Sequence, residues 1–146
     1  MNATNAKAPA RLRLLVALDG SLGDAAVLEE VTRLAASAPL EVTLLRVAHY
    51  HTRGEREVEW TRSQAIVEQA HARLALPEAA VHTLVCEGEV GEAIVAQAQA
   101  RKADLIVMAG HGHIALRRAI ERSLPDWVRR HASVPVVVVR ARRKAA

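Results

Sequence analysis

The sequence predicts an α/β protein, a three-layer sandwich in which helices cover both faces of a five-stranded parallel sheet. Short apolar runs alternate along the chain with segments whose apolar residues recur at helical spacing. The runs are almost continuously hydrophobic, which is typical of strands covered on both faces of a parallel sheet. Parallel strands joined through helices require right-handed crossovers, so this alternation builds three layers.

The first half of the chain carries three predicted strands and two helices. The opening run ends at Asp19, and the apolar residues after it indicate a helix that Ser21 or Asp24 could cap. A polar stretch from His49 to about Arg56 separates the second strand from the second helix. The elements follow in the order strand 12–18, helix 27–35, strand 41–47, helix 60–74 and strand 80–85.

The second half repeats the alternation. Gly88-Glu89-Val90-Gly91 opens a third helix, and the apolar run DLIVMA at 104–109 is a fourth strand. A glycine-containing segment follows, and Ser123 then has the features of a helix N-cap, with Asp126 as the acidic half of a capping box. The run PVVVV at 135–139 is the fifth strand.

Length and composition indicate one globular domain. We expect a domain over residues 11–140, a disordered segment at 1–10 and a basic tail at 141–146 of the 146 residues. An apolar run of about 18 residues is missing, and the first residues lack the apolar region of a secretory signal, so we expect a cytoplasmic protein without a membrane partner. The single cysteine, Cys86, provides neither an internal disulfide nor a zinc cluster.

Aromatic content and charge limit the partners. Tyr50, Trp60 and Trp127 are the only aromatic residues, too few for the stacking surfaces that single-stranded nucleic acid requires, so we do not expect a nucleic-acid partner. Positive charge is concentrated near the C-terminus, where residues 117–146 hold 9 Lys and Arg against 2 Asp and Glu. This block is either a solvated surface or a site for an acidic partner.

The expected ligand site follows from the fold. In open parallel sheets ligands bind beyond the carboxyl ends of the strands, which directs attention to Asp19, Val47 and the segment after Met108. The Asp19 carboxylate could accept hydrogen bonds from a ribose hydroxyl or an adenine amine. The alternative is that Asp19 only forms an Asx-turn with Gly20 and Ser21.

At these residues the chain resembles the universal stress protein family. Val16-Ala17-Leu18-Asp19-Gly20-Ser21 is similar to the segment that ends the family's first strand. The family signature G-x-x-G, nine residues, then G-[ST] falls without a gap on Ala109, Gly112, Arg122 and Ser123, and the ending R-H-A-x-x-P-V-x-V-V is matched at 130–139. The resemblance covers about residues 11–140.

The resemblance implies a fold, a ligand and an assembly. The implied fold is the adenine nucleotide alpha hydrolase-like sandwich with strand order 3-2-1-4-5. The implied function is a regulatory or binding protein that holds ATP or another adenine nucleotide weakly, as a homodimer through Pro135–Val139, which would also cover an apolar edge strand. The nucleotide-binding residues implied are Ala17, Asp19, Val47, Met108, Ala109, Gly112, His113, Ser123 and Leu124.

Two glycines of the family signature are replaced in this chain. Ala109 adds a Cβ where the backbone would approach the ligand, which is strained if the position needs a positive φ. Arg122 places a long cationic side chain directly before Ser123, where it would fill the phosphate pocket or bind an anion.

Other functions stay open at this point. One is a slow ATPase, although the suspected loop has no lysine of the kind that phosphoryl transfer usually uses. Another is a nucleotide-free protein that binds an acidic partner through Arg117, Arg118, Arg122, Arg129, Arg130 and Arg140–Lys144. We assign no catalytic residue and no metal site, since the pairs His49/His51 and His111/His113 lack clear carboxylate or cysteine partners.

Overall fold

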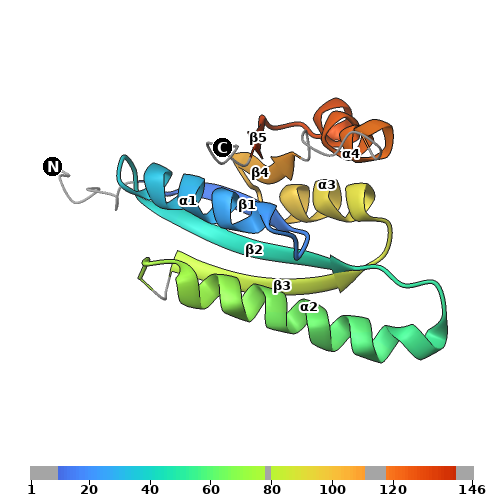
Figure 1. Cartoon of the computed structure of the whole chain (residues 1–146). Helices are drawn as coiled ribbons and strands as arrows, with labels where there is room; N and C mark the ends of the chain where they lie inside the picture. The colour runs from blue at the N-terminus through green and yellow to red at the C-terminus, as the bar shows by residue number, and fades with distance from the viewer. Residues whose placement is uncertain (1–9, 78–79, 111–117, 141–146) are drawn as a thin grey trace, which may run out of the picture.

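A computed structural model describes residues 10–77, 80–110 and 118–140, with the backbone alone at 118–123. Its sheet has five strands in the order β3-β2-β1-β4-β5, all paired in parallel, which confirms the predicted fold class and strand order (Figure 1). The strands are β1 (Leu12–Leu18), β2 (Leu40–Ala48), β3 (Val81–Glu87), β4 (Leu105–Gly110) and β5 (Val136–Arg140).

Four helices connect these strands and cover both faces of the sheet. Residues of α1 and α2 pack in one apolar cluster with the strands, and residues of α3 and α4 pack in the other. Since successive side chains of a strand point to opposite faces, Leu14 and Val16 of β1 join the first cluster and Leu15 joins the second. The helices are α1 (Gly23–Ala35), α2 (Arg53–Arg73), α3 (Val90–Ala100) and α4 (Arg118–His131).

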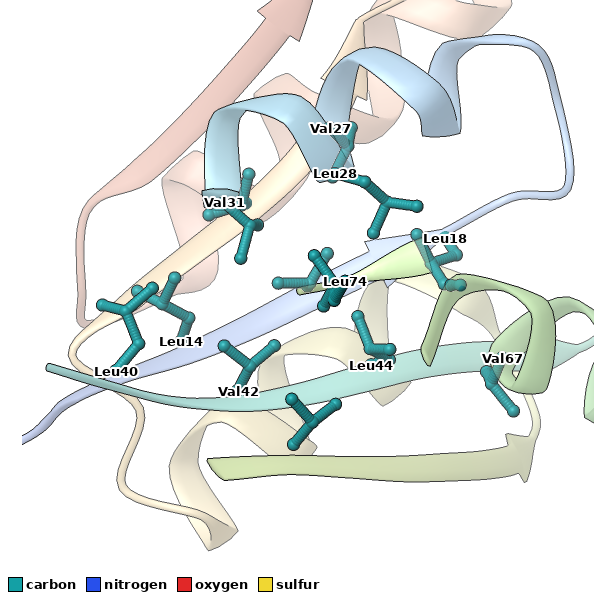
Figure 2. Close-up of a cluster of buried hydrophobic side chains, with 14 of the residues drawn as sticks. Leu14, Leu18, Val27, Leu28, Val31, Leu40, Val42, Leu44, Val67 and Leu74 are labelled. Carbon is teal, nitrogen blue, oxygen red and sulfur yellow. The ribbon is translucent and has the colours of Figure 1, made fainter. Parts of the chain in front are cut away.

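The central strands explain the apolar runs in the sequence. Figure 2 shows the first cluster, in which Val27, Leu28 and Val31 of α1 lie above Leu14, Val42 and Leu44 of the sheet. Both faces of β1 and β2 are buried in this way, so most of their side chains are apolar.

Two helices begin earlier than the sequence predicts. The polar stretch that we expected to be loop up to about residue 56 becomes helical at Arg53. Glu55 explains this start, because its carboxylate accepts the backbone N–H of His51 at 3.0 Å and thereby satisfies a donor beside the first turn. Thr52 and Glu55 have the spacing of a capping box, a signal that could have predicted this helix start.

The predicted helix start at Ser123 is wrong, because α4 begins at Arg118. A capping residue contributes only about 1 kcal/mol. Each residue added to a helix that has already formed makes another backbone hydrogen bond, and Arg, Ala and Glu favour helix at these positions. Pro125 consequently lies inside α4, where its ring is buried.

Among the residues that the structure describes, no helix combines the length and the apolar character needed to cross a membrane. The expectations of a disordered start and a basic tail fall on residues 1–9 and 141–146, outside the described part of the chain.

Candidate functional site

An apolar slot lies at the carboxyl edge of the sheet, where the resemblance places the ligand. It encloses about 50 Å³. Its floor comes from the ends of β1, β2 and β4, and its walls come from the first residues of α3 and from α4. The slot is lined by Ala17, Leu18, Asp19, Leu45, Arg46, Val47, Val90, Ile94, Met108, Ala109, Leu124 and Pro125.

Asp19 stands at the rim of this slot, in the turn between β1 and α1. Its Oδ1 accepts the backbone N–H of Ser21 at 2.8 Å, so the Asx-turn is present. Ser21 in turn accepts the N–H of Gly23 through Oγ at 3.1 Å, at the first residue of α1. Gly20 has φ +80°, a conformation that glycine adopts without strain. The turn therefore fixes where the Asp19 carboxylate sits.

Asp24 stabilises the same turn from the other side. Its two carboxylate oxygens accept the backbone N–H groups of Asp19 at 3.2 Å and of Gly20 at 2.9 Å. Burial and the neighbouring Asp19 carboxylate raise the pKa of Asp24 to about 6, although the two backbone hydrogen bonds act in the opposite direction. Asp19, at the rim of the slot, thus interacts with a second acid, Asp24, which does not line the slot.

An ion pair supports the β2 side of the slot. Arg46 donates from Nη2 to Oε1 of Glu59 on α2 at 2.9 Å, and the two side chains are 15% and 16% exposed. The Nε of Arg46 is buried and has no hydrogen-bond partner among the described residues. Such a buried donor has lost water without gaining an acceptor, which is unfavourable.

Close packing of α3 against α4 closes the opposite wall. The ring of Trp127 lies so near Gly91 that a Cβ at this position would be 2.7 Å from Cε3 of the ring. The same ring stacks on His131, with centroids 3.9 Å apart. Glycine at position 91 is therefore what allows α4 to approach α3 and to hold Leu124 and Pro125 over the slot.

The structure brings most of the predicted site residues together. Ala17, Asp19, Val47, Met108, Ala109 and Leu124 all line the slot. Gly112 and His113 lie outside the described residues, as do Arg117 and the pair His111/His113. The side chains of Arg122 and Ser123 are also outside them, while their backbone belongs to α4.

Ala109 does not adopt the strained conformation that a replaced glycine could require. Among the described residues, Lys102 is the only non-glycine with a positive φ. The Ala109 side chain packs in the cluster formed with α1, and a Cβ added to Gly23 would be 3.1 Å from it. Its methyl group therefore fills space next to α1, and the position needs no glycine for conformational reasons.

Sequence reasoning missed several residues of the slot. Arg46 is the clearest case, and the signal was a charged residue inside the predicted strand, directly before Val47. Val90 and Pro125 were assigned to helix starts, and their place in a wall follows only from how α3 and α4 pack.

The described residues contain no group of three or more His, Cys, Asp or Glu side chains that could hold a metal ion. His49 and His51 approach each other edge to face with ring centroids 5.1 Å apart, and a ring nitrogen of His49 lies 3.5 Å from the carbonyl of Gly88.

The fold and the slot define an α/β protein with an apolar slot at the carboxyl edge of its five-stranded parallel sheet. The chain matches the model of the universal stress protein family over residues 11–140. It therefore belongs to the universal stress protein family.

Individual relatives agree with this assignment. A universal stress protein of Methanocaldococcus jannaschii is 39% identical over 64 residues, which is 44% of this chain and 38% of that protein. The aligned part thus spans well under half of that relative. The universal stress protein UspA of Lactobacillus plantarum superimposes with a TM-score of 0.74 at 26% identity, covering 90% of this chain and 99% of that one. A universal stress protein solved in complex with cAMP gives a TM-score of 0.72 at 20% identity, over 88% and 96% of the two chains.

Proposed function

We propose that this protein binds an adenine nucleotide, with ATP as the first candidate, in the apolar slot, and acts as a regulatory binding protein. The single observation that carries the proposal is the slot itself, with apolar walls and the Asp19 carboxylate at its rim. Apolar walls suit an adenine ring, and a carboxylate at the rim can accept hydrogen bonds from an amine or from ribose hydroxyls.

The size of the slot supports weak binding. Its enclosed volume of about 50 Å³ is smaller than that of typical ligand pockets, which hold roughly 300–1,000 Å³. Binding would therefore need the walls of the slot, formed by α3 and α4, to open. The free energy needed for this movement lowers the observed affinity, because only the open form is competent to bind.

The comparison with the cAMP complex supports the class of ligand. That protein shares the fold, and it holds an adenine-containing nucleotide. At 20% identity the similarity is one of fold. For this chain, the support for nucleotide binding comes from the residues that line the slot.

Calorimetry tests the proposal. Nucleotide-stripped protein is titrated with ATP, ADP and AMP, and with GTP as a comparison. We expect heat that saturates with the adenine nucleotides, and we expect Asp19→Ala to weaken binding on the order of tenfold or more, as loss of a charged hydrogen bond does. The control is Glu68→Ala, which removes an exposed acid of α2 outside the slot. An unchanged dissociation constant in Asp19→Ala would remove Asp19 from the site.

A second assay separates binding from hydrolysis. The proposal is a binding function, so we expect no phosphate release above the buffer rate when purified protein is incubated with ATP. Release that follows the protein through every purification step and disappears in Ser123→Ala would favour a slow ATPase instead.

We further propose that two copies assemble through β5. This strand lies at an edge of the sheet, and its valines, Val136–Val139, are only partly buried. Pairing with a second copy would cover these valines and satisfy the free edge. Light scattering should give the mass of a dimer at micromolar concentration, and a lysine in place of Val138 should give a monomer.

The location that we propose is the cytoplasm, where adenine nucleotides are abundant. An unpaired cysteine, such as the described Cys86, is compatible with that reducing compartment. The exposed Arg129 and Arg130 of α4 are compatible with an acidic partner. Partner binding that is lost at moderate salt and unaffected by ATP would favour the nucleotide-free alternative.

A further inference from the structure

A larger hollow lies at the other edge of the sheet. It encloses about 300 Å³ at the N-terminal ends of β1 and β2, under the end of α3. In Figure 1 the strand arrows run away from this edge, so it is opposite to the slot. We call it the N-terminal hollow. It is lined by Arg13, Leu14, Leu15, Glu41, Thr43, Ala100, Arg101, Lys102 and Ala103.

Thr43 gives this hollow a polar floor. The residue is 6% exposed and stands on β2 opposite Leu15, on the face of the sheet that α3 covers. Within the described part of the chain, the Nε of Arg46 is the buried polar side-chain atom without a partner, so the Thr43 hydroxyl, which makes no hydrogen bond there, is open to the hollow. A hydroxyl that opens into a hollow can donate a hydrogen bond to a ligand bound there.

Cationic side chains surround the hollow. Arg13, Arg101 and Lys102 line it together with a single acid, Glu41. The Oε2 atom of Glu41 is 3.9 Å from the Nε atom of Arg13. No described carboxylate forms an ion pair with Arg101 or Lys102. Asp104 is a second acid nearby, and its Oδ2 accepts the backbone N–H of Arg13 at 2.8 Å, so three cationic side chains stand against two acidic ones. The lining therefore has an excess of positive charge.

The backbone at Lys102 is unusual for its residue type. Its φ of +54° lies in the left-handed region, at a position after a helix where glycine is normally found. The N–H groups of Lys102 and Ala103 bond to the carbonyls of Gln99 and Ala98, which completes the helix end. A lysine held where glycine would be unstrained is an outlier that points to a use for its side chain.

The end of α3 does not exclude an anion from the hollow. A helix C-terminus carries partial negative charge on its free carbonyls, which would repel an anion. Here Arg101, Lys102 and Ala103 donate backbone N–H groups to carbonyls of the last turn. The cations are then the dominant charges that face the hollow.

We propose that the N-terminal hollow is a second ligand site, which binds a small oxyanion such as the phosphate group of a small molecule. Arg101, Lys102 and Arg13 would supply charge and donors, and the Thr43 hydroxyl would donate a further hydrogen bond. Guanidinium groups match the paired oxygens of phosphate, and charged hydrogen bonds are the strong ones. This site is separate from the nucleotide slot and does not depend on it.

Backbone amide spectra in a phosphate titration test the proposal. Inorganic phosphate, and then pyrophosphate, is added at constant ionic strength balanced with chloride. We expect saturable shifts at Thr43 and at Ala100–Ala103, with little change around Asp19 and Ala109. Lys102→Gly keeps the backbone conformation, because glycine adopts a positive φ freely, and removes the side chain together with its cation. It should weaken phosphate binding on the order of tenfold, as loss of one charged contact does.

Three further variants test whether the phosphate binds in the N-terminal hollow. Thr43→Val retains the shape of the buried side chain and removes the hydroxyl, and we expect it to weaken phosphate binding by a factor of about three or more. Arg53→Ala removes an exposed cation at the start of α2, outside the hollow, and should leave the affinity unchanged. Asp19→Ala should also leave it unchanged, which separates this site from the nucleotide site.

Three results would overturn the proposal. The first is a titration in which chloride alone reproduces every shift. The second is phosphate binding that Lys102→Gly and Thr43→Val leave intact although both variants are folded. The third is a set of shifts centred on Ala109 and Leu124, which would place the phosphate at the slot.

Discussion

Asp24 and Asp19 are joined by a hydrogen bond from the backbone N–H of Asp19 to Oδ1 of Asp24 at 3.2 Å. The two carboxylates belong to one turn, and each also accepts a further backbone N–H, Asp24 from Gly20 and Asp19 from Ser21. The residue that we assign to the nucleotide is thus held in place by an acid that does not itself line the slot.

The titration of Asp24 should be visible in the stability of the fold. Burial and Asp19 raise its pKa from 3.8 to about 6, so the folded chain binds this proton more tightly than the unfolded chain does. The group therefore favours the folded state at low pH, and this contribution is lost as the pH rises from about 4 to about 6. Urea unfolding should show Asp24→Asn gaining stability relative to the wild type as the pH is raised across this window.

The control for this experiment is Asp126→Asn, which changes an exposed acid of α4. It removes a carboxylate that makes no hydrogen bond to the turn of Asp19 and Gly20. A stability difference between Asp24→Asn and the wild type that is constant from about pH 4 to about pH 7 would contradict the assignment.

Gly91→Ala should destabilise the protein although alanine favours helix. The added Cβ would be 2.7 Å from the ring of Trp127, so α3 and α4 must separate or the ring must move. Overpacking of this kind costs about 1–3 kcal/mol, more than the gain of up to about 1 kcal/mol in helix propensity. Urea unfolding with Trp fluorescence measures the loss, and adding Trp127→Leu should recover part of it.

Gly54→Ala is the matched substitution with the opposite sign. This glycine lies in the first turn of α2, and a Cβ at this position would have Oγ1 of Thr52 as its nearest neighbour, 3.9 Å away. Without a clash, the helix propensity of alanine should raise the free energy of unfolding by about 0.5–1 kcal/mol. A loss of stability as large as that of Gly91→Ala would show that contact with Trp127 is not the cause there.

The ion pair between Arg46 and Glu59 should show strong coupling. Replacing Arg46 with Met leaves a carboxylate that is 16% exposed without its partner, which we expect to cost about 2–3 kcal/mol. The double variant Arg46→Met, Glu59→Leu removes both charges and should be more stable than the sum of the two single changes predicts. Additive losses in this double-mutant cycle would mean that the pair contributes little.

Cys86 should react slowly with thiol reagents. Burial raises the pKa of its thiol, so the thiolate is scarce at neutral pH. The rate of labelling by a disulfide reagent at mildly alkaline pH should be well below the rate in urea. Equal rates in the folded and the unfolded protein would contradict this placement of Cys86 on β3.

The strands follow from the sequence because burial dictates them directly, whereas their order was implied by the resemblance to the universal stress protein family. The strand β1 spans the same residues as the apolar run, Leu12–Leu18. The residues on either side of it, Arg11 and Asp19, are charged and exposed, so the strand and its burial end at the same places. Helix starts are less predictable, because a cap such as Ser123 contributes only about 1 kcal/mol and an added turn can outweigh it. The site was predictable where a strand end defines it, as at Asp19 and Val47. Val90 and Pro125 were missed because the packing of α3 and α4 brings them to the slot.

The left-handed turn at Gly20 also has a mechanical consequence. A side chain there would meet Cδ1 of Ile66 at 2.9 Å, so the turn that carries Asp19 rests directly against α2. Displacing α2, by a bound macromolecule for instance, would remove the contact between Ile66 and the turn that holds Asp19. Ligand affinity at the carboxyl edge could in this way be tuned from the outside of the molecule without any contact with the ligand.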